Sequence, residues 1–133
     1  MLNVKILTPK NTLYAGSVDS VYIPTKSGEV GILTYHENYI ASIGTGKIEV
    51  EANGSKEIIL CKGGFAKTEN NILEVLVDDA VMANDLVIEK IKESEAKAQQ
   101  EVQRTDITAS DLLRLEKVLR YEKFKREFAE RNN

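Results

Sequence analysis

The chain has 133 residues, of which 18 are Lys or Arg and 21 are Asp or Glu, so its formal net charge is -3. This length is typical of a single domain and allows a hydrophobic core, while the slight acidic excess argues against nucleic-acid binding, which needs a basic surface to hold phosphates. The single cysteine, Cys61, excludes an internal disulfide, and the single histidine, His36, excludes a zinc site built on several imidazoles.

The first part of the chain predicts a β-rich domain. Apolar and polar residues alternate in short segments at residues 3–7, 17–25, 47–52, 56–62 and 71–80. Asn53-Gly54 between two of these segments predicts a hairpin, because both turn positions need positive φ, and Glu69–Asn71 predicts a second tight turn. Repeated short strands without a helical pattern between them favour a β-sandwich or a barrel.

The segment TKSGEVGILTYHENY at residues 25–39 is the candidate contact surface. Gly28 and Gly31 permit tight turns in it. Its amphipathic rings, of a kind enriched where proteins meet, belong to Tyr35, His36 and Tyr39. From the residues alone, an interface and a histidine that only packs against a backbone carbonyl are equally supported.

No group of residues predicts catalysis. GTGKIE at Gly44–Glu49 lacks the full spacing of a phosphate-binding loop and runs into a strand, so Gly44 and Gly46 are predicted to be turn glycines. No serine stands on a nucleophile elbow. KGGF at Lys62–Phe65 predicts a bulge or a close backbone approach. Cys61 lies in an apolar run and is predicted to be a buried, unreactive thiol. We therefore expect no catalytic residue, metal or cofactor.

After Asn84 the period changes to that of a helix. Apolar residues recur at near-helical spacing, a break follows at residues 104–111, and a second helical pattern extends to Phe128. Thr108 and Asp111 resemble a capping box at the start of that second helix. The sequence thus predicts an antiparallel hairpin of two helices with a thin apolar stripe, and domains at residues 1–83 and 84–133.

Four parts of the sequence carry a resemblance to a known family. VDSVYIPTKSGEVGIL, the following histidine, GTGKIEV and GGFAKTENNILEVLVDDA occur in that order, and together they resemble the epsilon subunit of F-type ATP synthases. The resemblance covers nearly the whole chain. It implies a ten-stranded β-sandwich followed by a two-helix hairpin, in a non-catalytic subunit of the rotating central stalk that joins the gamma subunit to the membrane-embedded c ring.

The resemblance also implies roles for residues of the contact segment. Glu29 is expected to touch the polar loops of the c ring, and His36, with Tyr35 and Tyr39, is expected to contact gamma. Many relatives have P-G-H-A-P around the histidine, whereas this chain has TYHENY. Both prolines are missing, so the shape of this loop is expected to differ while the docking role is kept.

The hairpin is expected to inhibit ATP hydrolysis. In the family it can extend along gamma and meet the catalytic alpha and beta subunits. The residues of the second helix that could pair with acidic positions on those subunits are Arg114, Lys117, Arg120, Lys123 and Arg126.

Some bacterial relatives bind ATP at the first helix through an [I/L]-D-x-x-R-A signature, which is degraded here. Leu86 matches the signature, but Val87 replaces the Asp, Lys90 replaces the Arg and Ile91 replaces the Ala. Valine accepts no hydrogen bond, and lysine lacks the planar fork of arginine. We expect no ATP binding of regulatory strength.

Two other functions stay open at this point. A free-standing sandwich could bind a small molecule, and a hydrolase could use His36. No segment approaches the ~20 apolar residues that cross a bilayer, and no signal peptide is predicted. The family implies the cytoplasmic face of a bacterial cell membrane, reached only through the complex, with the chloroplast thylakoid as the second location.

Overall fold

The computed structural model describes residues 1–34 and 37–132. Tyr35 and His36, two of the expected gamma contacts, lie outside the described residues. The elements of the described chain are β1 (Leu2–Leu7), β2 (Thr12–Val18), β3 (Ser20–Thr25), β4 (Gly28–Leu33), β5 (Tyr39–Ala52), β6 (Ser55–Glu69), β7 (Ile72–Val77), β8 (Ala80–Met82), the 3-10 helix η1 (Ala83–Asp85), α1 (Ile88–Val102) and α2 (Ala109–Arg131).

The chain divides into two compact units, Met1–Asn84 and Asp85–Asn133. The first unit contains the strands, and the second contains α1 and α2. The predicted fold class, a β-sandwich followed by a helical hairpin, is confirmed.

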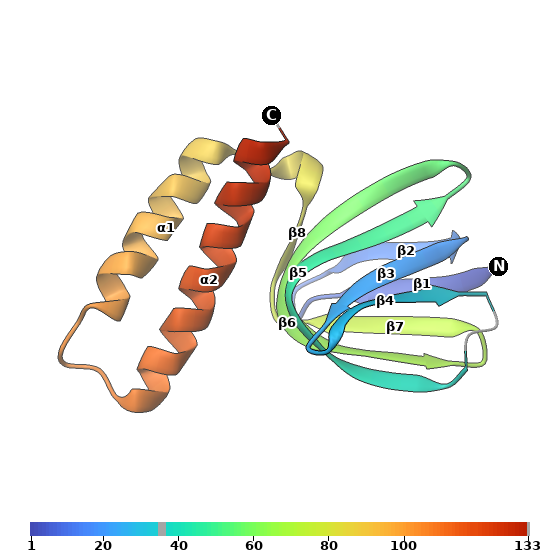
Figure 1. Cartoon of the computed structure of the whole chain (residues 1–133), viewed down its shortest axis with the longest axis horizontal. Coiled ribbons are helices and arrows are strands. Elements are labelled where there is room, and N and C mark those ends of the chain that lie inside the picture. Colours follow the sequence, from blue (N-terminus) through green and yellow to red (C-terminus); the bar gives the residue numbers. More distant parts are fainter. Residues whose placement is uncertain (35–36, 133) are drawn as a thin grey trace. The chain divides into compact units, whose positions relative to one another are not determined.

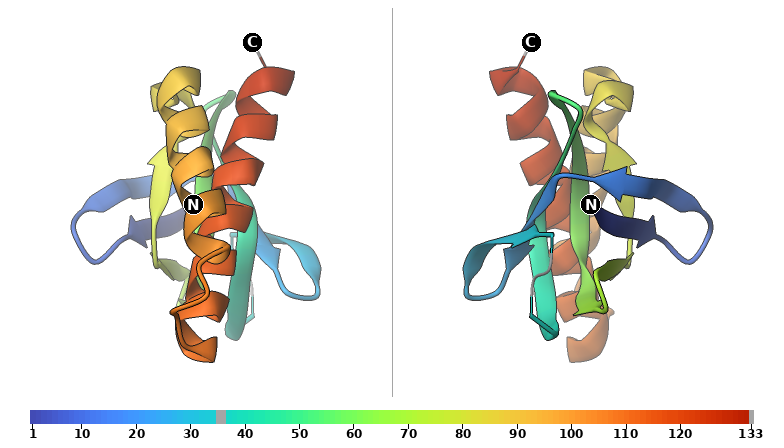
Figure 2. Two further views of the ribbon diagram at one scale, coloured as in Figure 1. Left: turned by 90° about the vertical axis from the view of Figure 1, so that its left-hand side faces the viewer. Right: turned by 90° about the vertical axis from the view of Figure 1, so that its right-hand side faces the viewer.

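The sandwich is built from one sheet that bends over itself. The strand order is β2-β1-β7-β6-β5-β3-β4, and β8 pairs with β6 outside this path. β1 and β7 are parallel, whereas the other pairs are antiparallel. β5 and β6 curve so strongly that their halves belong to different layers (Figure 1). The β1–β2 and β3–β4 hairpins project at opposite sides (Figure 2).

The predicted number of ten strands is wrong, because the described residues form eight. β5 and β6 run for 14 and 15 residues. Their pairing continues across the bend, from Ile43 opposite Gly64 to Thr45 opposite Lys62. β5 and β6 therefore each count as one strand. Dividing each of them at the bend would have given the two extra strands of the prediction.

Paired glycines form the bend of β6. Gly63 and Gly64 have φ values of 124° and 142°, which side-chain-bearing residues rarely adopt. A Cβ on Gly64 would lie 2.0 Å from the carbonyl oxygen of Leu76, so the predicted close backbone approach is confirmed. At this bend β6 exchanges its partner β8 for β7, and the Lys62 N–H donates to the Asp79 carbonyl at 3.0 Å.

Most of the segment predicted as a contact loop is a strand. Among the described residues of this segment, Thr25–Gly28 forms a tight turn and β4 follows as an edge strand of the sheet. Gly31 lies within β4 rather than in a turn. Its missing side chain makes room for the ring of Tyr22, whose Cε1 would lie 2.9 Å from a Cβ at this position.

Alternating residues from both layers fill the core, as the sequence pattern predicts. The largest buried aliphatic side chains of the sandwich core include Leu2, Ile6, Ile23, Ile32, Ile43, Ile48, Ile59 and Leu73. The predicted turns are also confirmed, because Asn53, Gly54, Asn70 and Asn71 all have positive φ. Two-residue turns of this kind match the twist of the strands that they join.

The hairpin has a much thinner core. On α1 only Ile91 and Ala98 are buried, while α2 buries Leu115, Tyr121, Glu122 and Ala129. Thr108 caps α2 as predicted, since its Oγ1 accepts a hydrogen bond from the Asp111 N–H at 3.1 Å. With so little apolar burial, polar contacts weigh more in the stability of this unit.

Cys61 is fully buried, as the sequence predicts. Burial raises the pKa of its thiol from 9.0 to about 11, although backbone hydrogen bonds partly oppose this rise. Since the folded state favours the neutral thiol, this group stabilises the fold below pH 9.0, and its contribution is lost as the pH rises toward about 11.

We predict that Cys61 does not react with a thiol-specific disulfide reagent at pH 8.5 in the native chain and reacts fully in urea, because the thiolate is the reactive species. Absorbance of the released thiolate measures this. A native rate close to the urea rate would contradict the burial.

Candidate functional site

The turn at Thr25–Gly28 presents Glu29 at the edge of the sandwich. Thr25 Oγ1 donates to the Gly28 carbonyl at 2.5 Å and accepts from the Ser27 N–H at 3.2 Å. Glu29 follows on edge strand β4, is exposed, and forms no ion pair with any described residue. Its carboxylate is available to a partner.

Tyr39 begins β5, the strand that a hydrogen bond ties to this turn. The Lys26 N–H donates to the Ser42 carbonyl at 3.3 Å, which ties the turn to the part of β5 that Tyr39 begins. Tyr39 itself is half-buried and packs against the sandwich core. Of the three predicted gamma contacts it is the one that the structure describes.

An exposed apolar stripe crosses the outer surface of the sheet beside Tyr39, and sequence reasoning missed it. We call it the apolar face, formed by Leu7, Ile40, Phe65 and Leu76. Phe65 and Leu76 are directly opposed on β6 and β7, and Leu7 is opposite Leu76 on β1. Ile40 is a diagonal neighbour of Phe65, since its direct partner is Lys67.

The apolar face is accessible and has a polar edge. Ile40 is 71% exposed and Phe65 is 49% exposed. A hollow of about 470 Å³, lined by the β1–β2 turn, Phe65 and Leu76, adjoins it. The Lys67–Glu69 ion pair, at 3.1 Å, lies on the same surface of β6. An apolar centre beside charged groups is the composition of a protein interface.

One sequence signal could have revealed this face. The β7 segment ILEVLV buries Leu73, Val75 and Val77, yet it also places Ile72 and Leu76 on the outer side. A strand with one solvated side should carry polar residues there. Apolar residues on both sides of a strand therefore indicate a second contact surface.

The positions of the degraded ATP signature surround the start of α1. Val87 is the N-cap residue, has no side-chain hydrogen bond, and is 46% exposed. Lys90 is exposed on the first turn, whereas Ile91 is buried and Leu86 is half-buried. Of these four side chains only Lys90 carries a polar group.

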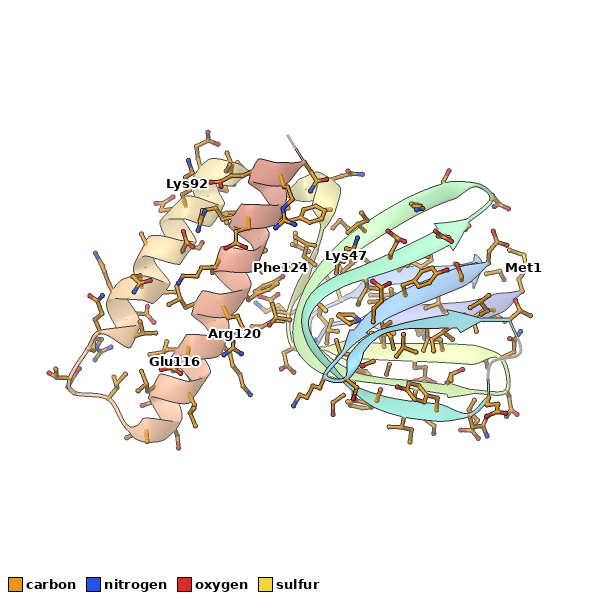
Figure 3. All side chains as sticks on the ribbon, viewed as in Figure 1. Met1, Lys47, Lys92, Glu116, Arg120 and Phe124 are labelled. Atoms are coloured by element: carbon orange, nitrogen blue, oxygen red, sulfur yellow. The ribbon has the colours of Figure 1, made fainter. Side chains whose placement is uncertain are left out.

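The basic residues of α2 differ in how they are engaged. Lys117, Arg120 and Lys123 are exposed and form no ion pair within the described part of the chain. Figure 3 shows Arg120 among the charged side chains that project around both helices. Arg114 lies 3.8 Å from Asp111, at the loose limit of an ion pair. These residues are available to an acidic partner.

Arg126 is instead held within the hairpin. Its Nε donates to Glu95 Oε1 at 2.7 Å, and its Nη1 lies 3.3 Å from Glu130 Oε2. The hydrogen bond from Arg126 to Glu95, followed by the charge of Glu95, raises the pKa of the guanidinium above its ordinary value. Arg126 joins an outside partner only if it leaves Glu95.

No helix among the described residues is both long and apolar enough to span a bilayer. Likewise, in residues 1–34 and 37–132 no three His, Cys, Asp or Glu side chains are grouped to hold a metal ion.

Comparison with known proteins gives a consistent family. A family model described as ATP synthase, Delta/Epsilon chain, beta-sandwich domain matches residues 1–83. An ATP synthase epsilon chain of Leptospira borgpetersenii is 34% identical over 116 residues, which cover 87% of this chain and 88% of the relative. An epsilon chain of Synechococcus sp. (strain JA-2-3B'a(2-13)) is 40% identical over 79 residues, or 59% of this chain and 58% of that one.

Solved structures share the fold. A chain in the cryo-EM structure of the Euglena gracilis mitochondrial ATP synthase OSCP/F1/c-ring aligns with a TM-score of 0.74 and 22% identity, covering 92% of this chain and 78% of that chain. A chain of the Tetrahymena thermophila mitochondrial ATP synthase central stalk and c-ring aligns with a TM-score of 0.59 and 12% identity, covering 99% and 96%.

Proposed function

Because this chain belongs to the epsilon-subunit family of F-type ATP synthases, we propose that it is a non-catalytic subunit of the central stalk. In this role it joins the gamma subunit to the c ring and rotates with them during ion-gradient-driven ATP synthesis. The observation that carries the proposal is the epsilon-chain match over 87% of this chain. Its proposed location is the cytoplasmic face of a bacterial cell membrane, as a peripheral part of the complex.

The proposed contacts lie on the sandwich. We assign the c-ring contact to Glu29, whose exposed carboxylate suits polar loops. We assign the gamma contact to Tyr39, together with Tyr35 and His36, and extend it to the apolar face. The exposed rings and aliphatic side chains of Ile40, Phe65 and Leu76 support this extension, since burying them against a partner is favourable.

The hairpin is proposed to inhibit ATP hydrolysis by meeting the alpha and beta subunits in an extended state. The thin apolar burial of α1 supports this, because a weakly packed unit opens at a cost of only a few kcal/mol. Lys117, Arg120 and Lys123, which have no ion-pair partner among the described residues, supply the charges for an acidic surface. The hairpin state is proposed to be independent of ATP, since Val87 and Ile91 offer the nucleotide no hydrogen bond.

Deleting residues 84–133 is expected to raise the hydrolysis rate of the assembled enzyme several-fold. The triple variant K117Q/R120Q/K123Q should reproduce much of this increase, because it removes the proposed charge contacts while it keeps the helix. The matched control K90Q/K92Q/K97Q removes three exposed lysines from α1 and should leave the rate unchanged. A coupled assay of ADP release measures all three, and equal rates for the deletion and the intact chain would refute the inhibitory role.

A further inference from the structure

One ion pair joins the two helices of the hairpin. Arg126 Nε and Glu95 Oε1 lie 2.7 Å apart across 31 residues of sequence. The side chains are 27% and 17% exposed, so water only partly screens the contact. The other ion pairs of α2 in the described chain, from Arg114, Lys125 and Arg126, have their acidic partners on α2 itself.

Glu95 is incompletely paired in this closed hairpin. Its second oxygen, Oε2, is buried and has no hydrogen-bond partner among the described residues, and the same is true of Glu122 Oε2 one turn before Arg126. A buried carboxylate oxygen without a donor opposes closure, because it has given up its water. The Arg126 guanidinium offsets this for Glu95, and Lys125, 3.1 Å from Glu122 Oε1, does so for Glu122.

α1 contributes few fully buried apolar side chains to the hairpin, and its Ile88 and Val102 are only half-buried. Ile91 and Ala98 are the only buried residues of α1, and Ala98 contributes a single methyl group. The closed state therefore depends on a charge pair whose carboxylate is better solvated when the helices separate.

We propose that the Glu95–Arg126 ion pair is a latch that holds the hairpin closed, and that its release opens the helices and frees Arg126 for an acidic partner surface. Losing Arg126 leaves Glu95 buried and uncompensated, which favours opening. Losing both charges leaves no buried, uncompensated carboxylate, so opening is no longer favoured. The contact between Glu95 and Arg126 supports the opening and closing of the helices, whereas the effect of that opening on ATP hydrolysis rests on the proposed function.

The latch is testable in the isolated full-length chain by pulsed electron–electron distance measurement. Spin labels at K92C and E127C, in a C61A background, lie on exposed positions near the open end of the hairpin. Because Glu95 pairs with Arg126 in the closed hairpin, positions 92 and 127 each lie within about one helical turn of that pair. In an end-to-end arrangement the helices extend at about 1.5 Å per residue, which moves the labels tens of ångströms apart.

We expect R126Q to raise the ratio of long to short distances by roughly tenfold, because Glu95 loses its cation. The effect should be smaller than for a fully buried ion pair, because water partly screens this one. Adding E95Q to R126Q should return the ratio to within about threefold of the starting chain. The control R120Q replaces an exposed arginine of the same helix that forms no ion pair within the described residues, and it should leave the ratio of distances in the isolated chain unchanged. The apolar pair E95L/R126M should lower the ratio of long to short distances below that of the starting chain, because an apolar replacement of a buried pair often stabilises.

The recovery in E95Q/R126Q separates a latch from a general effect of Arg126 on helix stability, which a second substitution would not reverse. If R126Q keeps the distances of the starting chain, or if the double variant stays as open as R126Q, the latch is overturned. Circular dichroism on each variant shows whether the helices persist. If R126Q loses its helices, the E95L/R126M and E95Q/R126Q distances decide the question.

The assembled enzyme provides a separate readout. With an inhibitory hairpin, E95L/R126M should raise ATP hydrolysis toward the rate of the deletion, because it keeps the helices together and removes one cation of α2. Distances that respond with unchanged hydrolysis would support the latch and refute the inhibitory role. Distances that do not respond would refute the latch whatever the hydrolysis rate.

Discussion

Replacing Gly64 by alanine is expected to lower the free energy of unfolding of the sandwich by about 4 kcal/mol or more. The new Cβ would lie 2.0 Å from the Leu76 carbonyl oxygen and 2.7 Å from the Val77 Cα. Both are backbone atoms of the paired strand, so neither can turn away as a side chain would. The φ of 142° adds strain of its own.

Urea denaturation followed by circular dichroism measures this effect, and Gly54→Ala is the matched control. Gly54 also has positive φ, at 78°, but a Cβ there would meet no atom within 4 Å. Its substitution therefore carries only the backbone cost, about 1 kcal/mol. If the two variants unfolded at the same urea concentration, the close approach at the bend of β6 would not be what makes Gly64 necessary.

Phe65→Asp is expected to weaken binding to the gamma subunit by about a hundredfold or more, since aromatic residues at the centre of an interface dominate its affinity. Phe65 lies in the middle of the apolar face, between Leu76 and Ile40. Its 49% exposure means that the substitution removes little of the sandwich core. An aspartate there would be buried without a partner in the complex.

Surface plasmon resonance against immobilised gamma subunit measures the loss, and Leu113→Asp is the control. Leu113 is 63% exposed on α2, so this variant makes the same kind of change outside the sandwich. The control should bind as the starting chain does. Equal affinities for F65D and L113D would exclude the apolar face from the gamma contact.

Local signals in the sequence were sufficient for much of the fold. Asn53-Gly54 predicts its hairpin because the required backbone conformation suits those residues, and Thr108 predicts the start of α2 because its hydroxyl accepts from a nearby N–H. Each of these signals involves residues within a few positions of one another.

Features that depend on distant residues could not be predicted this way. Gly31 suggested a turn, but it lies in β4 under the ring of Tyr22, and Gly46 similarly lies in β5 against Pro24. A glycine that makes room for a side chain on a neighbouring strand cannot be told from a turn glycine until the strands are paired.

The candidate site follows the same rule. Glu29 was proposed through family resemblance and Tyr39 through its amphipathic ring, and the Lys26–Ser42 hydrogen bond joins the turn before Glu29 to the strand that Tyr39 begins. The apolar face can be recognised only when the register of four neighbouring strands, β1, β7, β6 and β5, is known. The Glu95–Arg126 pair needs the antiparallel alignment of two helices, which their separate periodicities do not specify.

Native mass spectrometry of the enzyme, purified through a tag on a catalytic subunit, shows whether this chain is a stalk subunit held by its sandwich. We expect one copy of this chain for each gamma subunit, and the same stoichiometry for a chain truncated after Ala83. A complex that contains gamma but lacks this chain would show that it is not a stalk subunit.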